Sequence, residues 1–193
     1  MIMAKHLCWK VESDYDYSST QVNLESTLAN RIMGWGESNI PDEDLYTDDD
    51  DKGREDNPHI TILYGIVSQE PDEMIELLSN EKGRPVNAKL GKVSLFENSD
   101  DYDVVKIGVE SEDLARLHDK IVDNIKNESD FPEYKPHVTI AYVTRGSGNL
   151  YSGSSKFEGT EMSFDEVVFS SPDGERTLIA LKRSVASNLN WGT

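Results

Sequence analysis

The sequence predicts an α/β (α+β) fold of two lobes related by a pseudo-twofold axis, with two sheets lining a central cleft and the helices outside. The motif Pro-His-aliphatic-Thr-Ile occurs at residues 58–62 and again at 136–140, and each copy is expected to form a strand. The order strand, helix, histidine strand also occurs twice, with Val-Glu-Ser at residues 11–13 matching Val-Glu-Ser at residues 109–111. Two such units can share one core, so the 193 residues are expected to form a single bilobal domain, 1–193.

Residues 6–13 should form the first strand, because aromatic and β-branched side chains alternate there with polar ones. Residues 14–20 should then form a polar loop, in which a hydroxyl among residues 18–20 caps the following helix. Gly34 and Gly36 should end that helix, since glycine is favoured at helix ends. Its buried stripe is predicted to contain Leu24, Leu28, Ile32 and Trp35.

Residues 38–56 hold nine acidic side chains and few apolar ones, which predicts a mobile acidic insertion. Two interpretations stay open for this segment: a solvated loop without a function, or a lid or partner-binding loop beside His59. At the other end of the chain, residues 184–193 form a tail that is polar apart from Leu189 and Trp191.

The second half of the chain alternates strands and helices. Residues 71–83 predict a short amphipathic helix, and residues 86–96 and 102–110 alternate as the two strands of a hairpin. Ser111 should cap the next helix through its hydroxyl. Beyond the second histidine strand, a glycine- and serine-rich loop and two further strands are expected at residues 146–159, 162–169 and 177–182.

The duplicated motif places an imidazole and a hydroxyl on one face of each strand. Side chains two residues apart in a strand point the same way, so His59 lies beside Thr61 and His137 beside Thr139. An imidazole titrates near neutrality, so one histidine can accept a proton while the other donates one. Threonine hydroxyls can donate hydrogen bonds to the non-bridging oxygens of a phosphate. These four residues are the predicted catalytic residues, in a scheme that requires no metal.

Five other residues are candidates for substrate binding. Lys10 in the first predicted strand and Lys106 near the second repeat could point into the cleft, although a lysine in such a place is more often a solvated one. Three loop tyrosines could stack on a nucleobase or could be plain surface residues. They are Tyr15, Tyr17 and Tyr151.

Three further ring side chains are expected to be structural. Strand alternation places Tyr64 and Tyr142, five residues after each histidine, on the face opposite the histidines, where they should pack. His118 lies among leucine and isoleucine positions of a predicted helix, which indicates a packed histidine.

The composition limits the partners. A formal charge of −18 disfavours an extended nucleic acid, because such binding depends on neutralising phosphates, whereas a small phosphate ligand held by local donors is compatible with it. The sequence shows no run of eighteen apolar residues and no secretory leader, so we expect no membrane association and a cytoplasmic location. The single cysteine, Cys8, excludes an internal disulfide and lacks metal-ligand spacing around it.

With its motifs His59-Ile60-Thr61 and His137-Val138-Thr139, the chain resembles the 2H phosphoesterase superfamily over roughly residues 6–183. Residues 58–65 and 168–174 are also similar to small phage and prophage members of that superfamily. The resemblance implies a metal-independent enzyme without a cofactor that acts on 2′,3′-cyclic phosphates, 2′-5′ linkages or small cyclic nucleotides. The acidic insertion departs from the family pattern.

The favoured hypothesis is a phosphodiesterase that cleaves or opens a small nucleotide, and the phage likeness implies cyclic oligonucleotide signals as substrates in a counter-defence role. The rival hypothesis within the enzyme class is an RNA-end enzyme for 2′,3′-cyclic phosphates or 2′-5′ linkages. Two hypotheses lie outside the enzyme class: a protein that binds a nucleotide without cleaving it, and an acidic interaction protein that uses residues 38–56.

Overall fold

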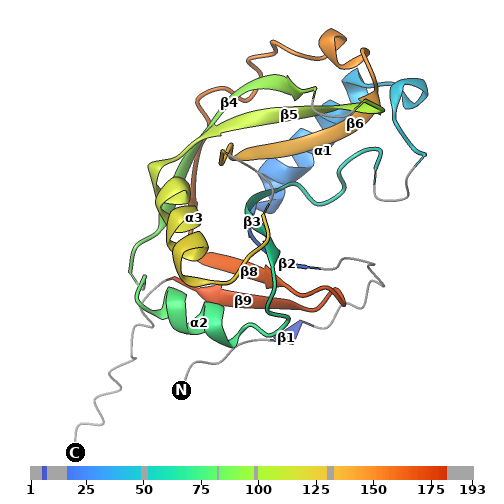
Figure 1. Cartoon of the computed structure of the whole chain (residues 1–193). Helices are drawn as coiled ribbons and strands as arrows, with labels where there is room; N and C mark the ends of the chain where they lie inside the picture. Colours follow the sequence, from blue (N-terminus) through green and yellow to red (C-terminus); the bar gives the residue numbers. More distant parts are fainter. Residues whose placement is uncertain are drawn as a thin grey trace, which may run out of the picture.

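The computed structural model describes residues 6–7, 17–48, 52–81, 83–97, 100–129 and 133–181. They form two antiparallel sheets with helices packed against them (Figure 1). The five-stranded sheet has the order β1-β9-β8-β2-β3, and the four-stranded sheet has the order β6-β5-β4-β7. The strands are β1 (His6–Leu7), β2 (Ser18–Asn23), β3 (His59–Ile66), β4 (Val86–Phe96), β5 (Tyr102–Glu110), β6 (His137–Thr144), β7 (Glu161–Phe164), β8 (Glu166–Ser170) and β9 (Arg176–Ala180). The helices are α1 (Ser26–Asn39), α2 (Asp72–Ser79) and α3 (Glu112–Asn124), with 3₁₀ turns η1 (Asp42–Asp44) and η2 (Gly148–Leu150).

The predicted duplication is present as β2-α1-β3 and β5-α3-β6. The two histidine strands, β3 and β6, are the edge strands of different sheets, and they contact one another. Helix α1 packs on β6 and α3 packs on β3, so each helix lies against the histidine strand of the other unit (Figure 1). Buried apolar residues of both sheets form one hydrophobic cluster, which holds the two histidine strands together.

The first repeat begins later than the sequence indicates. The strand before α1 is β2, whereas residues 8–16, which include most of the predicted first strand, lie outside the described part of the chain. The prediction of a loop with a capping hydroxyl at residues 18–20 is wrong, because these residues are paired within β2. Ser18 and Thr20 are completely buried. The polar composition of residues 18–20 is typical of a loop, but their burial between two neighbouring strands favours the strand conformation.

Helix α1 also differs from its prediction at both ends. Its N-cap is Glu25, whose carboxylate accepts a hydrogen bond from the Thr27 amide, so Leu24 precedes the helix. The helix continues through Gly34 and Gly36 to Asn39. A β-carbon at Gly36 would lie 3.0 Å from the Ile140 Cγ2 methyl, so glycine here permits the close approach of α1 to β6.

Other elements confirm the pattern, with one exception. The boundaries of β4 and β5 match residues 86–96 and 102–110, and the Ser111 hydroxyl caps α3 by accepting from the Leu114 amide at 2.9 Å. The strand expected at residues 162–169 is instead two strands in different sheets, β7 and β8, with Asp165 between them. The polar residues Asp165 and Glu166 interrupt the alternation of Met162 and Phe164 at the point where the chain changes sheet.

The acidic segment contributes backbone bonds to the outer edge of β6. The Tyr46 amide donates to the Tyr142 carbonyl at 3.0 Å, and the Tyr142 amide donates to the Gly53 carbonyl at 2.8 Å. The Glu55 amide donates to the Ile140 carbonyl at 2.9 Å. The described residues of this segment thus extend the four-stranded sheet, while mobility of the segment stays a prediction. Over the described ranges, no helix has the length and apolar character needed to span a membrane.

Candidate active site

Both histidine strands contain a β-bulge at the same place. In β3, His59 lies opposite Asn23 and Thr61 opposite Gln21, but the next pair is Leu63 with Thr20, so Ile62 is skipped. The bulge adds one residue, which shifts the alternation of side chains beyond it. Tyr64 consequently pairs with Ser19 and lies on the same face as His59 and Thr61.

The second strand repeats this geometry. His137 lies opposite Gly108 and Thr139 opposite Lys106, and Ile140 is skipped before Ala141 pairs with Val105. Tyr142 then lies opposite Val104, which shares its face with Lys106. The expectation that Tyr64 and Tyr142 point away from the histidines is therefore wrong. We call the shared surface the histidine face, and it carries His59, Thr61, Tyr64 and Gln21 from one unit and His137, Thr139, Tyr142 and Lys106 from the other.

Matching hydrogen bonds fix the two imidazoles. His59 Nδ1 lies 2.9 Å from the Asn57 carbonyl oxygen, and His137 Nδ1 lies 2.8 Å from the Lys135 carbonyl oxygen. A carbonyl can only accept, so Nδ1 carries the proton in both rings. Nε2 is therefore the ring atom that can take or give a proton in each histidine.

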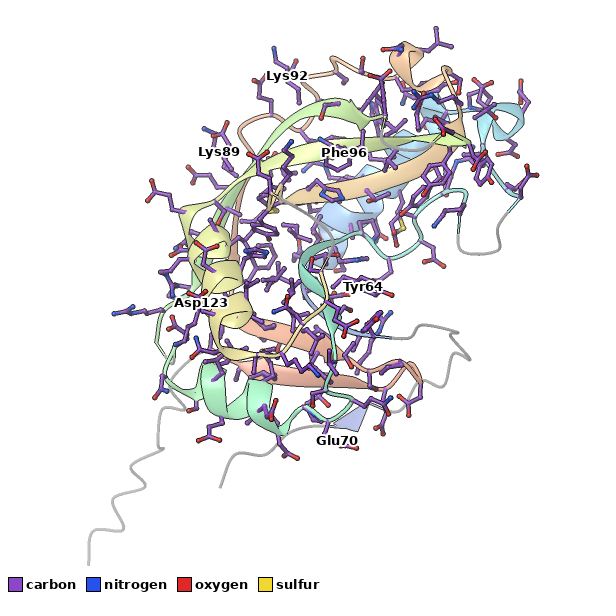
Figure 2. The ribbon with its side chains drawn as sticks, in the orientation of Figure 1. Tyr64, Glu70, Lys89, Lys92, Phe96 and Asp123 are labelled. Carbon is purple, nitrogen blue, oxygen red and sulfur yellow. The ribbon has the colours of Figure 1, made fainter. Side chains whose placement is uncertain are left out.

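The surroundings of His137 favour its neutral form. Burial lowers the pKa of His137, the bond to the Lys135 carbonyl opposes this, and the positive charges of Lys106 and His59 add to the lowering. The Phe96 and His137 rings meet edge to face, with 4.8 Å between centroids. Figure 2 shows Phe96 beside the four-stranded sheet and Tyr64 beside β3.

Lys106 is held on the histidine face by its own contacts. Its Nζ donates to the Ser94 hydroxyl at 2.9 Å and lies 4.1 Å from the centroid of the Phe96 ring. Burial lowers the pKa of the Lys106 ammonium, and the charge of Lys135 lowers it further. The lysine is thus a partly desolvated cation close to Thr139, where an anionic oxygen could be bound.

The segment that holds each histidine through a backbone carbonyl is hydrogen-bonded to the strand of the other histidine. On one side, the Glu55 amide bonds the Ile140 carbonyl of β6, and the Glu55 carboxylate accepts from the amide of Asn57 at 3.0 Å. Asn57 in turn holds His59. On the other side, the Tyr134 hydroxyl donates to the Thr61 carbonyl of β3 at 3.0 Å. Tyr134 directly precedes Lys135, whose carbonyl bonds His137.

The comparisons with known proteins agree with this geometry. The sequence profile described as the 2′-5′ RNA ligase superfamily matches residues 38–147, which contain both histidine motifs and more than half of the chain. The chain belongs to this superfamily. The resemblance to 2H phosphoesterases is thereby confirmed. No curated protein matches the chain.

Solved structures of the superfamily share the fold. Escherichia coli LigT complexed with phosphate has 16% identity and a TM-score of 0.61, covering 89% of this chain and 100% of its own. LigT complexed with 3′-AMP has 16% identity and a TM-score of 0.60, covering 81% and 87% respectively. Kluyveromyces marxianus Usb1 has 12% identity and a TM-score of 0.55, covering 86% and 99%.

Within this superfamily fold, the predicted binding residues fall in different places. Lys106 lies on the histidine face and Tyr17 meets Tyr64 edge to face, whereas Lys10 and Tyr15 lie outside the described residues. Their roles in substrate binding stay predictions. The Tyr151 hydroxyl donates a hydrogen bond to the Asp44 carboxylate. Burial, and after it this hydrogen bond, raises the pKa of Tyr151 to about 12.

The prediction that His118 is structural agrees with its contacts. Its ring stacks on Tyr134 at 4.2 Å between centroids with an interplanar angle of 8°. Burial raises the pKa of the Tyr134 phenol, so its proton remains for the bond to Thr61.

Sequence reasoning missed Gln21 and Glu55. Gln21 occupies the position in the first unit that Lys106 has in the second, because each lies opposite the motif threonine. Burial raises the pKa of the Glu55 carboxyl, and the nearby charge of His59 opposes that rise. Gln21 was expected at the start of the first helix and Glu55 in the acidic insertion, so strand alternation gave no signal for them.

Proposed function

We propose that this chain is a phosphodiesterase that cleaves or opens a phosphodiester in a small nucleotide by proton transfer through His59 and His137. The observation that carries the proposal is a pair of histidines that begin two adjoining edge strands, each with its Nδ1 bonded to the backbone carbonyl two residues earlier. These bonds dedicate Nε2 of both rings to proton transfer. Thr61 and Thr139 share a face with the histidines and supply hydroxyl donors for the phosphate oxygens.

The electrostatics suggest which histidine is the base. A neutral imidazole is required to take a proton from the attacking oxygen, and burial together with the charge of Lys106 favours neutral His137. We therefore assign His137 as the base and His59 as the acid that protonates the leaving oxygen. Lys106 and the two threonine hydroxyls stabilise the charge on the non-bridging oxygens during this displacement.

Two kinds of substrate fit this chemistry. One is an RNA end with a 2′,3′-cyclic phosphate or a 2′-5′ linkage, which the LigT complex with 3′-AMP supports as a nucleotide-binding relative. The other is a small cyclic oligonucleotide, as the likeness to phage proteins suggests, in which case the enzyme would remove a defence signal. A histidine pair can serve both, since only the attacking oxygen differs: water opens a cyclic phosphate, and a 2′-hydroxyl cleaves a 3′-5′ linkage.

The test is turnover of both kinds of substrate by purified protein in the presence of EDTA. Adenosine 2′,3′-cyclic phosphate and 2′-5′-linked diadenosine represent the first kind, and cyclic diadenylate represents the second. His59→Ala and His137→Ala should each lower turnover roughly a hundredfold or more, because each removes a proton-transfer group.

The double variant should be no slower than the slower single variant, since two groups that act in one concerted step lose their effect together. Wild-type turnover in either single variant would contradict the paired mechanism. A ligand that binds and is recovered intact after long incubation would instead identify a nucleotide-binding protein.

A further inference from the structure

Four tyrosines on or beside the histidine face form two equivalent pairs. The Tyr17 and Tyr64 rings meet edge to face, with 6.2 Å between centroids and 82° between planes. The Tyr102 and Tyr142 rings meet in the same way at 5.4 Å and 78°. In each pair, one tyrosine comes four residues before Gln21 or Lys106, and the other follows the bulge of the histidine strand.

The two pairs lie on opposite sides of the histidines. Past Thr61, β3 runs along the segment before β6, where the Gly65 carbonyl accepts from the Glu128 amide at 2.8 Å. Past Thr139, β6 runs instead along the segment before β3, where the Tyr142 carbonyl accepts from Tyr46. Each bulge tyrosine lies two register positions beyond its threonine, or about 7 Å along the sheet.

We propose that the two tyrosine pairs are base-binding subsites, and that the substrate carries one nucleobase on each side of the cleaved phosphodiester. The substrate class is thus two nucleosides joined through one phosphate, in a linear or a cyclic molecule. A mononucleoside 2′,3′-cyclic phosphate would fill only one subsite. This inference rests on the proposed function, because it places the reacting phosphate at the histidine pair.

The two subsites differ in what covers them. Tyr64 is 38% exposed, so a base can reach its ring directly. Over the other pair, Lys52 Nζ lies 4.7 Å from the Tyr142 centroid and 5.6 Å from the Tyr102 centroid. A base that stacks on either ring competes with the lysine for that ring, and base stacking on an aromatic side chain changes an equilibrium roughly 5- to 150-fold.

Binding of non-cleavable dinucleotides tests the inference separately from catalysis. The probe is 2′-deoxydiadenosine 3′-5′ monophosphate, which lacks the internal nucleophile. It is compared with two counterparts, each of which lacks one of the two adenines. Calorimetry with the full chain should show that loss of either adenine weakens binding roughly 5- to 150-fold. Tyr64→Ala should abolish the effect of one adenine and Tyr142→Ala the effect of the other, while the phenylalanine variants should retain both.

Leu150→Ala, at a side chain that is 76% exposed and belongs to neither pair, is the control and should retain both effects. The inference is overturned if removal of either adenine changes the dissociation constant less than twofold, or if both effects persist in Tyr64→Ala and Tyr142→Ala. Base-dependent binding without histidine-dependent turnover of any substrate would overturn the proposed function and leave the subsites standing. Histidine-dependent turnover without base-dependent binding would overturn the two subsites and leave the proposed function standing.

Discussion

The anchors of the two histidines are backbone carbonyls, of Asn57 and Lys135. No side-chain substitution at these two positions removes the acceptor, so the tautomer depends on the course of the chain before each strand. That course is fixed in turn by Glu55 on one side and by Tyr134 on the other. The histidines are therefore oriented by the joining of the two units and not by a local partner side chain.

Lys106→Gln should move the acidic limb of the pH–rate profile to higher pH. The positive charge of Lys106 disfavours protonated His137, so its removal raises the pKa of His137, and a base that must be neutral then needs a higher pH. Burial, the largest cause of the lowered pKa, remains in the variant, so the shift should recover only part of the lowering. The pH dependence of kcat/KM and the His137 NMR titration measure it.

Lys89→Gln is the matched control for the lysine variant. Lys89 is an exposed lysine on the neighbouring strand, 3.4 Å from the Glu110 carboxylate, and its removal should leave the profile in place. An unmoved or acid-shifted profile in Lys106→Gln would contradict His137 as the base.

At the residue scale, the duplicated His-x-Thr motif was sufficient to predict four residues that the fold brings to one surface. Lys106 was found as well, because it lies in a strand that alternates clearly. Gln21 and Glu55 were missed, because their importance comes from pairing across β2 and β6, which no local pattern shows.

Tyr134 ties the chain before β6 to β3, and Tyr134→Phe should weaken this connection between elements. The variant leaves the Thr61 carbonyl without its hydroxyl donor, which should lower the free energy of unfolding by about 1–2 kcal/mol. The same bond positions Thr61 relative to the strand of His137, so turnover should also fall, by roughly three- to tenfold. Denaturant titration and steady-state kinetics measure the two effects.

Tyr151→Phe removes a hydroxyl bond between two residues that both lie outside the histidine strands. Its partner is Asp44, so stability should fall by about 1 kcal/mol while turnover stays within twofold of wild type. Equal losses of turnover in the two tyrosine variants would show that the Tyr134 bond has no positioning role.

Gly34→Ala and Gly36→Ala should have opposite effects within one helix. A β-carbon at Gly34 meets nothing within 4 Å, so alanine should raise the free energy of unfolding by about 0.5–1 kcal/mol through helix propensity. At Gly36 the β-carbon would press on the buried Ile140 side chain at 3.0 Å. Overpacking costs about 1–3 kcal/mol. Denaturant unfolding should therefore place Gly36→Ala at least about 1 kcal/mol below Gly34→Ala, and equal stabilities would contradict close packing of α1 on β6.

At the element scale, strands and helices with clear alternation or capping were predictable, such as β4, β5 and α3. Bulges were not, because the skipped residues Ile62 and Ile140 are ordinary strand residues whose displacement depends on the register with the neighbouring strand. That single displacement moved Tyr64 and Tyr142 to the histidine face. To predict the face on which a side chain beyond a bulge lies, one must therefore know the strand pairing, which only the folded chain shows.

Across the whole molecule, the net charge opposes the charge at the site. The chain carries −18, yet the histidine face holds Lys106, and Lys52 lies over its tyrosines. The Debye length is about 8 Å at physiological ionic strength, so a small anion bound beside these cations is attracted locally while the distant acidic residues are screened. A long polyanion would extend over the acidic surface and be repelled.

Added salt should consequently weaken binding of a dinucleotide far less than it weakens typical protein–nucleic acid complexes. It should also raise the affinity for a long strand relative to the affinity for a dinucleotide. Screening removes the repulsion from the net charge, and few phosphates are neutralised, so little counterion release opposes binding. Dissociation constants of 2′-deoxydiadenosine monophosphate and of a long single-stranded RNA, measured between about 20 and 200 mM salt, test this expectation. A loss of affinity for the RNA of roughly a thousandfold over this range is typical of a protein that neutralises many phosphates, and it would contradict a site built for a small nucleotide.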